Sequence, residues 1–409
     1  MADFMTTTPE PKIADQPVRF FRHAAARIAR HSLGQVAGCR TALAEPVRIQ
    51  ALHILTYALQ LDEQWPLARD LLLLLADKLE QSSYRDGWLP LLEHGLRLSQ
   101  QYQDRKTMAE LQLRIGYLLQ VSGQLAAACD HYADSATAFA EIGHPERRAR
   151  VLNQYAYAVR QQQQRPRSMQ LLQEALTLVA EEHPERANAF FVRGWLALDD
   201  CNWQGAADDF AKAVAILEKW GTSYQLACAL RDLAVPLYWL HNLEEASNAL
   251  QRAAVLFGHL NNQFQQAVVK MNWGIILLTH HQPTVALSLF VEAEPVFRQL
   301  HDDENLGKLY LNQGLAYRAV GKFQHSLHLL RAAISLFEQI GNSDWLANTV
   351  DELGLTLLQM GETQQAVTTF QEALTILATA PEPSSHRHNQ IVGHLQTALQ
   401  SVTPTKELW

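Results

Sequence analysis

The chain has 409 residues and a formal net charge of −8, from 34 Lys and Arg against 42 Asp and Glu. Apolar residues make up 48% of it and charged residues 19%, which excludes an intrinsically disordered chain. Its 19 glycines and 15 prolines are fewer than average usage would give, so helices are favoured over turn-rich sheets.

In chain order, the polar residues 1–15 are expected to be mobile, and residues 16–62 to form a degenerate helical repeat that caps the fold. Residues 63–380 contain eight regular units, and residues 381–409 a capping helix over 386–401 and a tail. The first residues lack the apolar segment of a secretory signal, and no apolar run reaches the ~18 residues of a membrane span. We therefore expect a cytoplasmic protein that does not contact membranes.

The eight units share one spacing, which is clearest around Gly354. This anchor is Gly or Ala, small residues follow 12 and 19 positions later, and a large apolar residue follows 16 positions later, with Trp88 of the first unit as the one exception among the small residues. The step between anchors is 40 residues, with one step of 38. Small residues let two antiparallel helices approach closely, and the large residue fills the space beside them. The anchors are Ala76, Gly116, Ala156, Gly194, Ala234, Gly274, Gly314 and Gly354.

Helix breakers lie where such hairpins must turn or join. Gly123, Gly321 and Gly361 are placed at turns within units, and Pro145 and Pro184 at the first turn of the following unit's helix. Each unit is therefore predicted to be a first helix of ~18 residues, a short turn and a second helix of ~17 residues.

This pattern resembles the tetratricopeptide repeat, which has small residues at its eighth, twentieth and twenty-seventh positions and a large one at its twenty-fourth. The usual period is 34 residues, so the 40-residue step is more similar to the long-helix class of Pins-type scaffolds and MalT-type sensor domains. The resemblance implies an all-α, right-handed α-solenoid of antiparallel helix hairpins.

The sequence offers no starting point for catalysis. It contains no phosphate-binding GxxxxGK loop, no GxGxxG, no GxSxG and no HExxH. The four cysteines are far apart in the sequence. The best candidates for metal ligands are His386, His388 and His394, and they lack the further ligands that a metal site needs. We therefore expect no enzymatic activity, no cofactor and no metal.

A solenoid presents a concave surface, and one stripe of each first helix is predicted to face it. Asn272 and Asn312 occupy the same position in consecutive units, and the resemblance implies that they hold the backbone of an extended peptide. The alternative interpretation is a solvated helix face with Trp195 in the core. The predicted binding residues are Arg114, Arg150, Asn153, Arg160, Arg231, Asp232, Trp239, Asn272, Lys308, Asn312, Arg318 and Glu352.

Charge is spread unevenly, with a net charge of +3 over residues 1–170 and −11 over residues 171–409. Six arginines lie within residues 17–50, so docking of an acidic partner there is an alternative to a solvated arginine face. The overall pI of 6.1 does not favour a nucleic-acid partner.

Two functions follow from these patterns. The first is a non-enzymatic scaffold or adaptor that binds an extended peptide or a partner helix in the groove. The second is a ligand- or peptide-sensing module, similar to MalT-type or pheromone-receptor proteins, that acts on a separate output protein.

Overall fold

The computed structural model describes residues 15–38, 43–61, 64–81, 87–380 and 385–402, which form α-helices joined by short connections. Of the segments predicted to be mobile, residues 1–15 and the tail 403–409, all but Asp15 lie outside the described residues, and Asp15 begins a helix. The helices are α1 (Asp15–Gly38), α2 (Glu45–Ala58), α3 (Trp65–Gln81), α4 (Leu89–Gln101), α5 (Arg105–Val121), α6 (Leu125–Glu141), α7 (Pro145–Gln161), α8 (Arg165–Thr177), α9 (Pro184–Asp199), α10 (Trp203–Trp220), α11 (Ser223–Trp239), α12 (Leu243–His259), α13 (Gln263–Thr279), α14 (Pro283–Gln299), α15 (Asp303–Ala319), α16 (Phe323–Ile340), α17 (Ser343–Gln359), α18 (Thr363–Ala378) and α19 (Ser385–Val402).

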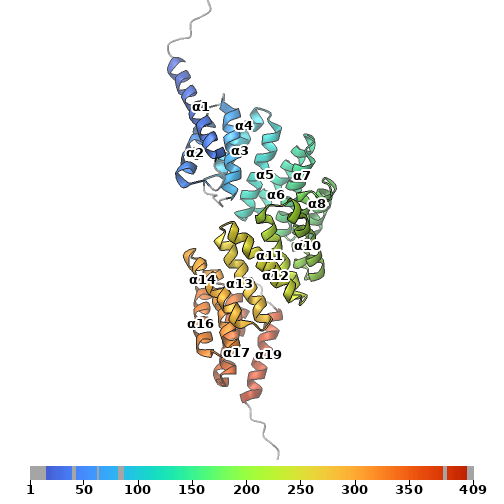
Figure 1. Ribbon diagram of the computed structural model, residues 1–409, viewed down its shortest axis with the longest axis vertical. Helices are drawn as coiled ribbons and strands as arrows, with labels where there is room; N and C mark the ends of the chain where they lie inside the picture. Colours follow the sequence, from blue (N-terminus) through green and yellow to red (C-terminus); the bar gives the residue numbers. More distant parts are fainter. Residues whose placement is uncertain (1–14, 39–42, 62–63, 82–86, 381–384, 403–409) are drawn as a thin grey trace, which may run out of the picture. The chain divides into compact units, whose positions relative to one another are not determined.

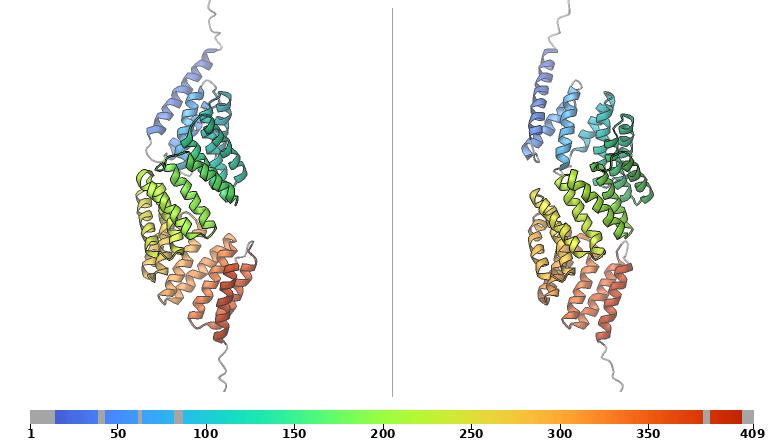
Figure 2. Two further views of the ribbon diagram at one scale, coloured as in Figure 1. Left: turned by 90° about the vertical axis from the view of Figure 1, so that its right-hand side faces the viewer. Right: turned by 45° about the vertical axis from the view of Figure 1, so that its right-hand side comes forward.

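The helices divide into two compact units, residues 1–196 and residues 197–409, called here the N-terminal and C-terminal units. In the N-terminal unit α5 packs on α6 and α7 on α8, and in the C-terminal unit each odd-numbered helix from α11 to α17 packs on the next helix (Figure 1). Figure 2 shows these hairpins stacked side by side within each unit. The predicted all-α solenoid of antiparallel hairpins is confirmed.

The predicted anchor residues pack against the predicted large residues. A methyl group added at Gly354 would lie 2.6 Å from the ring of Phe370, which is fully buried. At Gly116 it would lie 2.8 Å from the ring of Tyr132. The anchor is therefore glycine at these two positions because the ring on the second helix occupies the space that a Cβ atom of the anchor would need.

Most helices end in the same way, with a residue in the left-handed region followed by a hydrogen bond back to the helix. His241, for example, has a φ of 61°, and the N–H of Asn242 donates to the carbonyl of Leu237 at 2.9 Å. His281 and His301 take the same position after α13 and α14, with φ of 56° and 52°. These three histidines are therefore turn residues that end a helix.

The first helices of consecutive hairpins are neighbours. In the C-terminal unit α13 contacts α15, and α15 contacts α17, whereas each second helix packs mainly on the helices directly before and after it in the chain. In the N-terminal unit α5 contacts α7 in the same way. One face of each unit is therefore built from first helices. Among the described residues, no helix combines the length and the apolar character needed to cross a membrane.

Candidate functional site

An apolar row follows the face built from first helices. The residue directly after each anchor is large and apolar, and in every hairpin from α5 to α18 it is partly exposed. Because the anchor itself faces the second helix, the next residue lies about 100° further round the first helix. The apolar row consists of Tyr117, Tyr157 and Trp195 in the N-terminal unit and Val235, Ile275, Leu315 and Leu355 in the C-terminal unit.

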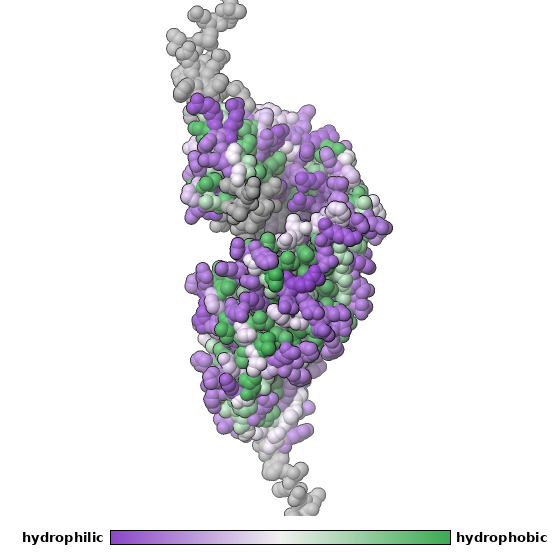
Figure 3. Space-filling view, viewed as in Figure 1, coloured by the Kyte–Doolittle hydropathy of each residue, from purple (hydrophilic) through white to green (hydrophobic). Residues whose placement is uncertain are grey.

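In the C-terminal unit a cavity of about 170 Å³ opens between α11 and α13. Val235 and Ile275 of the apolar row line it, together with the ring of Tyr238. Arg231 and Asn272 supply its polar groups. On the face drawn in Figure 3, apolar side chains reach the surface of this unit among hydrophilic ones. The cavity can therefore take an apolar group whose polar end meets a guanidinium or an amide.

Asn272 and Asn312 lie beside this row, one on α13 and the next on α15. Both side chains are partly exposed, and neither amide makes a hydrogen bond with any residue that the structure describes. Each amide therefore keeps a donor and an acceptor available to a ligand.

Arg231 and Asp232 form a pair that stabilises α11. The carboxylate of Asp232 is 3% exposed and accepts a hydrogen bond from Arg231 Nε at 2.7 Å. Arg231 Nη1 also donates to Gln265 Oε1 of α13 at 2.6 Å. Burial lowers the pKa of Arg231, but the charge and hydrogen bond of Asp232 outweigh it, so the net pKa is raised. Arg231 thus reaches the cavity as a fixed cation, while Asp232 lies in the interior.

Trp239 lies at the end of α11 and is 54% exposed. Its ring stacks on that of Trp203 from α10, with centroids 5.2 Å apart and an interplanar angle of 14°. Tyr238 meets it edge-on at 5.5 Å. The three rings form a firm aromatic surface beside the cavity.

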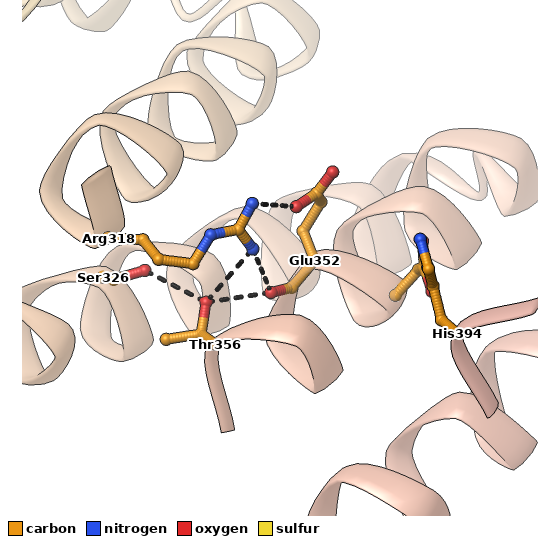
Figure 4. Close-up of polar contacts among 6 residues, drawn as sticks. Arg318, Ser326, Glu352, Thr356 and His394 are labelled. Carbon is orange, nitrogen blue, oxygen red and sulfur yellow. Dashed lines mark hydrogen bonds and ion pairs between the residues drawn. The ribbon is translucent and has the colours of Figure 1, made fainter. Parts of the chain in front are cut away.

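Three predicted charged residues are paired within the C-terminal unit. Lys308 Nζ lies 2.6 Å from Glu304 and 5.2 Å from the ring centroid of Trp345. Arg318 of α15 contacts Glu352 of α17 at 2.7 Å and donates to its carbonyl oxygen at 3.0 Å (Figure 4). These charges stabilise the contact between first helices and are not freely available to a partner.

The histidines of α19 do not gather into a metal site. His394 Nδ1 lies 2.9 Å from the buried carboxylate of Asp351 on α17, and His386 and His388 are exposed. Within the described part of the chain, no three His, Cys, Asp or Glu side chains could hold a metal ion together.

In the N-terminal unit a second cavity, of about 220 Å³, opens between α5 and α7. The predicted residues Arg114 and Arg150 line it, whereas Arg160 lies nearer to α9, with its guanidinium 5.0 Å from the ring centroid of Trp195. Asn153 is different, because it is 2% exposed and its Nδ2 donates to the carbonyl oxygen of Glu185 at 2.9 Å. Asn153 therefore joins α7 to α9 inside the protein.

The arginine-rich segment 17–50 is described only in part. Arg27 and Arg30 are exposed on α1, and Arg48 lies 3.8 Å from Glu45. Arg40 lies outside the described residues. The cavity between α1 and α2, which Ile28, Ile49 and Tyr57 help to line, has no arginine among its lining residues.

Most of the apolar row escaped the sequence-based prediction of the site. Val235, Ile275, Leu315 and Leu355 look like ordinary core residues of a helix in the sequence. The signal that could have found them is their constant place directly after the anchor, combined with a large side chain in every unit.

A family model described as tetratricopeptide repeat matches residues 305–379, which span α15 to α18. No curated relative matches the sequence. Among solved structures, the apo form of RapI is 12% identical with a TM-score of 0.56, over 72% of this chain and 87% of RapI. A Signal Transduction ATPase with Numerous Domains from Pyrococcus horikoshii, described as having a tetratricopeptide repeat sensor, is 14% identical with a TM-score of 0.59. That alignment covers 82% of this chain and 50% of the Pyrococcus protein. At these identities the likeness concerns the fold.

Proposed function

We propose that this chain, a tetratricopeptide-like repeat protein, is a non-enzymatic scaffold or adaptor. It binds an extended peptide or a partner helix along the face built from first helices. Repeats of this type indicate a protein-interaction or regulatory role, and a peptide-binding scaffold is one specific case of such a role.

The observation that carries the proposal is the pair Asn272 and Asn312. Their amides are partly exposed, make no hydrogen bond with a described residue and recur at one position of consecutive hairpins. A peptide backbone offers alternating N–H and C=O groups, which an amide can satisfy together. Ile275 and Leu315 beside them give apolar contact for the side chains of the peptide.

The test uses peptides selected from a displayed random library on the whole chain and then measured by fluorescence anisotropy. Asn272→Ala with Asn312→Ala should weaken the selected peptides about tenfold or more, because two hydrogen bonds of about 1 kcal/mol each are lost. Asn248→Ala is the matched control, since Asn248 is exposed on the second helix α12. Equal affinity of the double variant and the control would refute the role of the two asparagines.

A second candidate function is a sensing module, and the cavity between α11 and α13 favours it. An apolar cavity of about 170 Å³ with Arg231 and Asn272 at its polar side suits a small ligand or a single side chain. The Pyrococcus protein is described as having such repeats as a sensor.

A thermal-shift screen with metabolites and short peptides separates the two functions. A sensor should gain thermal stability from a small ligand, because ligand that binds only the folded state stabilises it. Val235→Phe, which fills the cavity, should abolish that gain and leave the binding of peptides along Asn312 intact. A screen in which only long peptides stabilise the chain would exclude the sensing function.

A further inference from the structure

The cavity between α5 and α7, called here the α5–α7 pocket, is polar where the cavity of the C-terminal unit is apolar. It has a volume of about 220 Å³ and is lined by Glu110, Leu113, Arg114 and Tyr117 of α5 and by Arg150 and Gln154 of α7. All of these residues belong to first helices of the N-terminal unit. The pocket is therefore part of the binding face of that unit.

The acidic residue of the pocket is already neutralised. Glu110 is 6% exposed, and its Oε1 lies 3.2 Å from Nε of Arg147, which comes from outside the pocket. The pocket is also lined by two guanidinium groups, from the buried Arg114 and the exposed Arg150. Arg150 therefore places an exposed positive charge at the pocket.

Three hydrogen-bonding groups of the pocket have no partner among the residues that the structure describes. They are the guanidinium of Arg150, the hydroxyl of Tyr117 and the side-chain amide of Gln154. All three carry N–H or O–H donors. Donors that converge on one cavity beside a cation suit a group that accepts several hydrogen bonds and carries negative charge.

The surroundings of the pocket favour a peptide as the carrier of that charge. The apolar row of this unit is aromatic, with Tyr117, Tyr157 and Trp195 on successive first helices. The guanidinium of Arg160 lies 5.0 Å from the ring of Trp195, which adds a second cation along the same face. Aromatic and arginine side chains together are the residue types that dominate protein interfaces.

We propose that the α5–α7 pocket binds a side-chain carboxylate of an acidic peptide segment of a partner protein. Arg150 neutralises the carboxylate, and Tyr117 and Gln154 donate hydrogen bonds to its oxygens. Flanking residues of the peptide pack on the aromatic row. The site uses different residues from the asparagine site of the C-terminal unit and stands whether or not that site binds a peptide.

The test starts from the whole chain with Asn272→Ala and Asn312→Ala, which removes the amides of the other site. Selection from a displayed random peptide library on this variant should enrich sequences rich in Asp and Glu. A labelled peptide from that selection should lose about tenfold or more in affinity when Arg150 is changed to Ala, because a charge-assisted contact is lost. The same peptide with its acidic residues changed to Gln or Asn should lose at least as much.

Arg97→Ala is the matched control, because Arg97 is an exposed arginine on the second helix α4. An equal loss in Arg97→Ala and Arg150→Ala would overturn the proposal, since it would show attraction to the general charge of the unit. Enrichment of sequences without an excess of Asp and Glu would also overturn it. So would a single-stranded oligonucleotide that binds through Arg150 more tightly than the acidic peptide. A negative result for the α5–α7 pocket leaves the binding of peptides through Asn272 and Asn312 unaffected. Each of the two proposals can therefore be refuted without the other.

Discussion

At the scale of single residues, the anchor and its partner sixteen positions later are matched in size. Where the anchor is Ala, the partner is always Leu, and where the partner is aromatic, the anchor is always Gly. The reason is geometric, because an aromatic ring on the second helix fills the space that a Cβ atom of the anchor would need. The alanine pairs are Ala76–Leu92, Ala156–Leu172 and Ala234–Leu250, and the aromatic pairs are Gly116–Tyr132, Gly194–Phe210, Gly274–Phe290 and Gly354–Phe370.

This matching predicts that Gly354→Ala and Phe370→Leu compensate each other. Gly354→Ala places a methyl group 2.6 Å from a buried ring, and we expect a net loss of about 1–2 kcal/mol despite the better helix propensity of Ala. Phe370→Leu alone leaves a cavity and also destabilises the protein.

The double variant recreates the pair found at Ala234 and Leu250. It should therefore be more stable than the sum of the single changes by about 1 kcal/mol. Urea unfolding of the four proteins measures this coupling. Additive effects would show that the ring does not limit the anchor.

At the scale of elements, the last helix, α19, covers the end of the C-terminal unit. It packs on α18 and also touches α17. Ile391 and Ala398 are fully buried in this contact, and Arg387 Nε donates to Asp344 Oδ1 at 3.1 Å. Burial raises the pKa of the Asp351 carboxyl group, and the facing His394 partly offsets this rise. We propose that the helix covers an apolar surface on which a further hairpin would otherwise pack.

If α19 covers the end of the unit in this way, substituting two of its apolar residues by Ala should reduce stability by very different amounts. Ile391→Ala should reduce stability by about 2–4 kcal/mol, because Ile391 is fully buried. Leu399→Ala should change it by less than about 0.5 kcal/mol, because Leu399 is 45% exposed. Thermal or urea unfolding of the two variants checks the difference. Equal, small effects would mean that α19 is only loosely attached.

The hairpins could be predicted from the sequence because their packing repeats, so Gly354 and Phe370 recur as a pattern that can be counted. The charged residues of the stripe could not be placed in this way. Arg318 lies next to Glu352 only because one first helix packs on the next, and this contact changes two apparent surface groups into a partly buried pair. Asn153 is buried for the same reason, by its hydrogen bonds to Glu185. Periodicity gives the face of a helix, but not the partner that a side chain finds on its neighbour.

At the scale of the whole molecule, the faces built from first helices carry different side chains in the two units. The N-terminal unit presents aromatic rings and guanidinium groups, as in Tyr117 and Arg150. The apolar row of the C-terminal unit is aliphatic, as in Ile275, and the amide of Asn272 lies beside it. If both proposals hold, the two units select different kinds of peptide, and one partner with an acidic and an apolar segment would engage both in turn.

The left-handed turn residues have a consequence for how this protein could change over time. From residue 201 to residue 301 they are Cys201, His241, Asn261, His281 and His301, none of them glycine, whereas Gly321, Gly341 and Gly361 serve the last turns. A residue with a Cβ atom costs roughly 1 kcal/mol more than glycine in this conformation. Substitution to glycine at any of these positions in the middle of the chain should therefore increase the stability of the fold. Single substitutions to glycine there would offset destabilising changes elsewhere, so the exposed faces of the first helices are free to diverge while the fold persists.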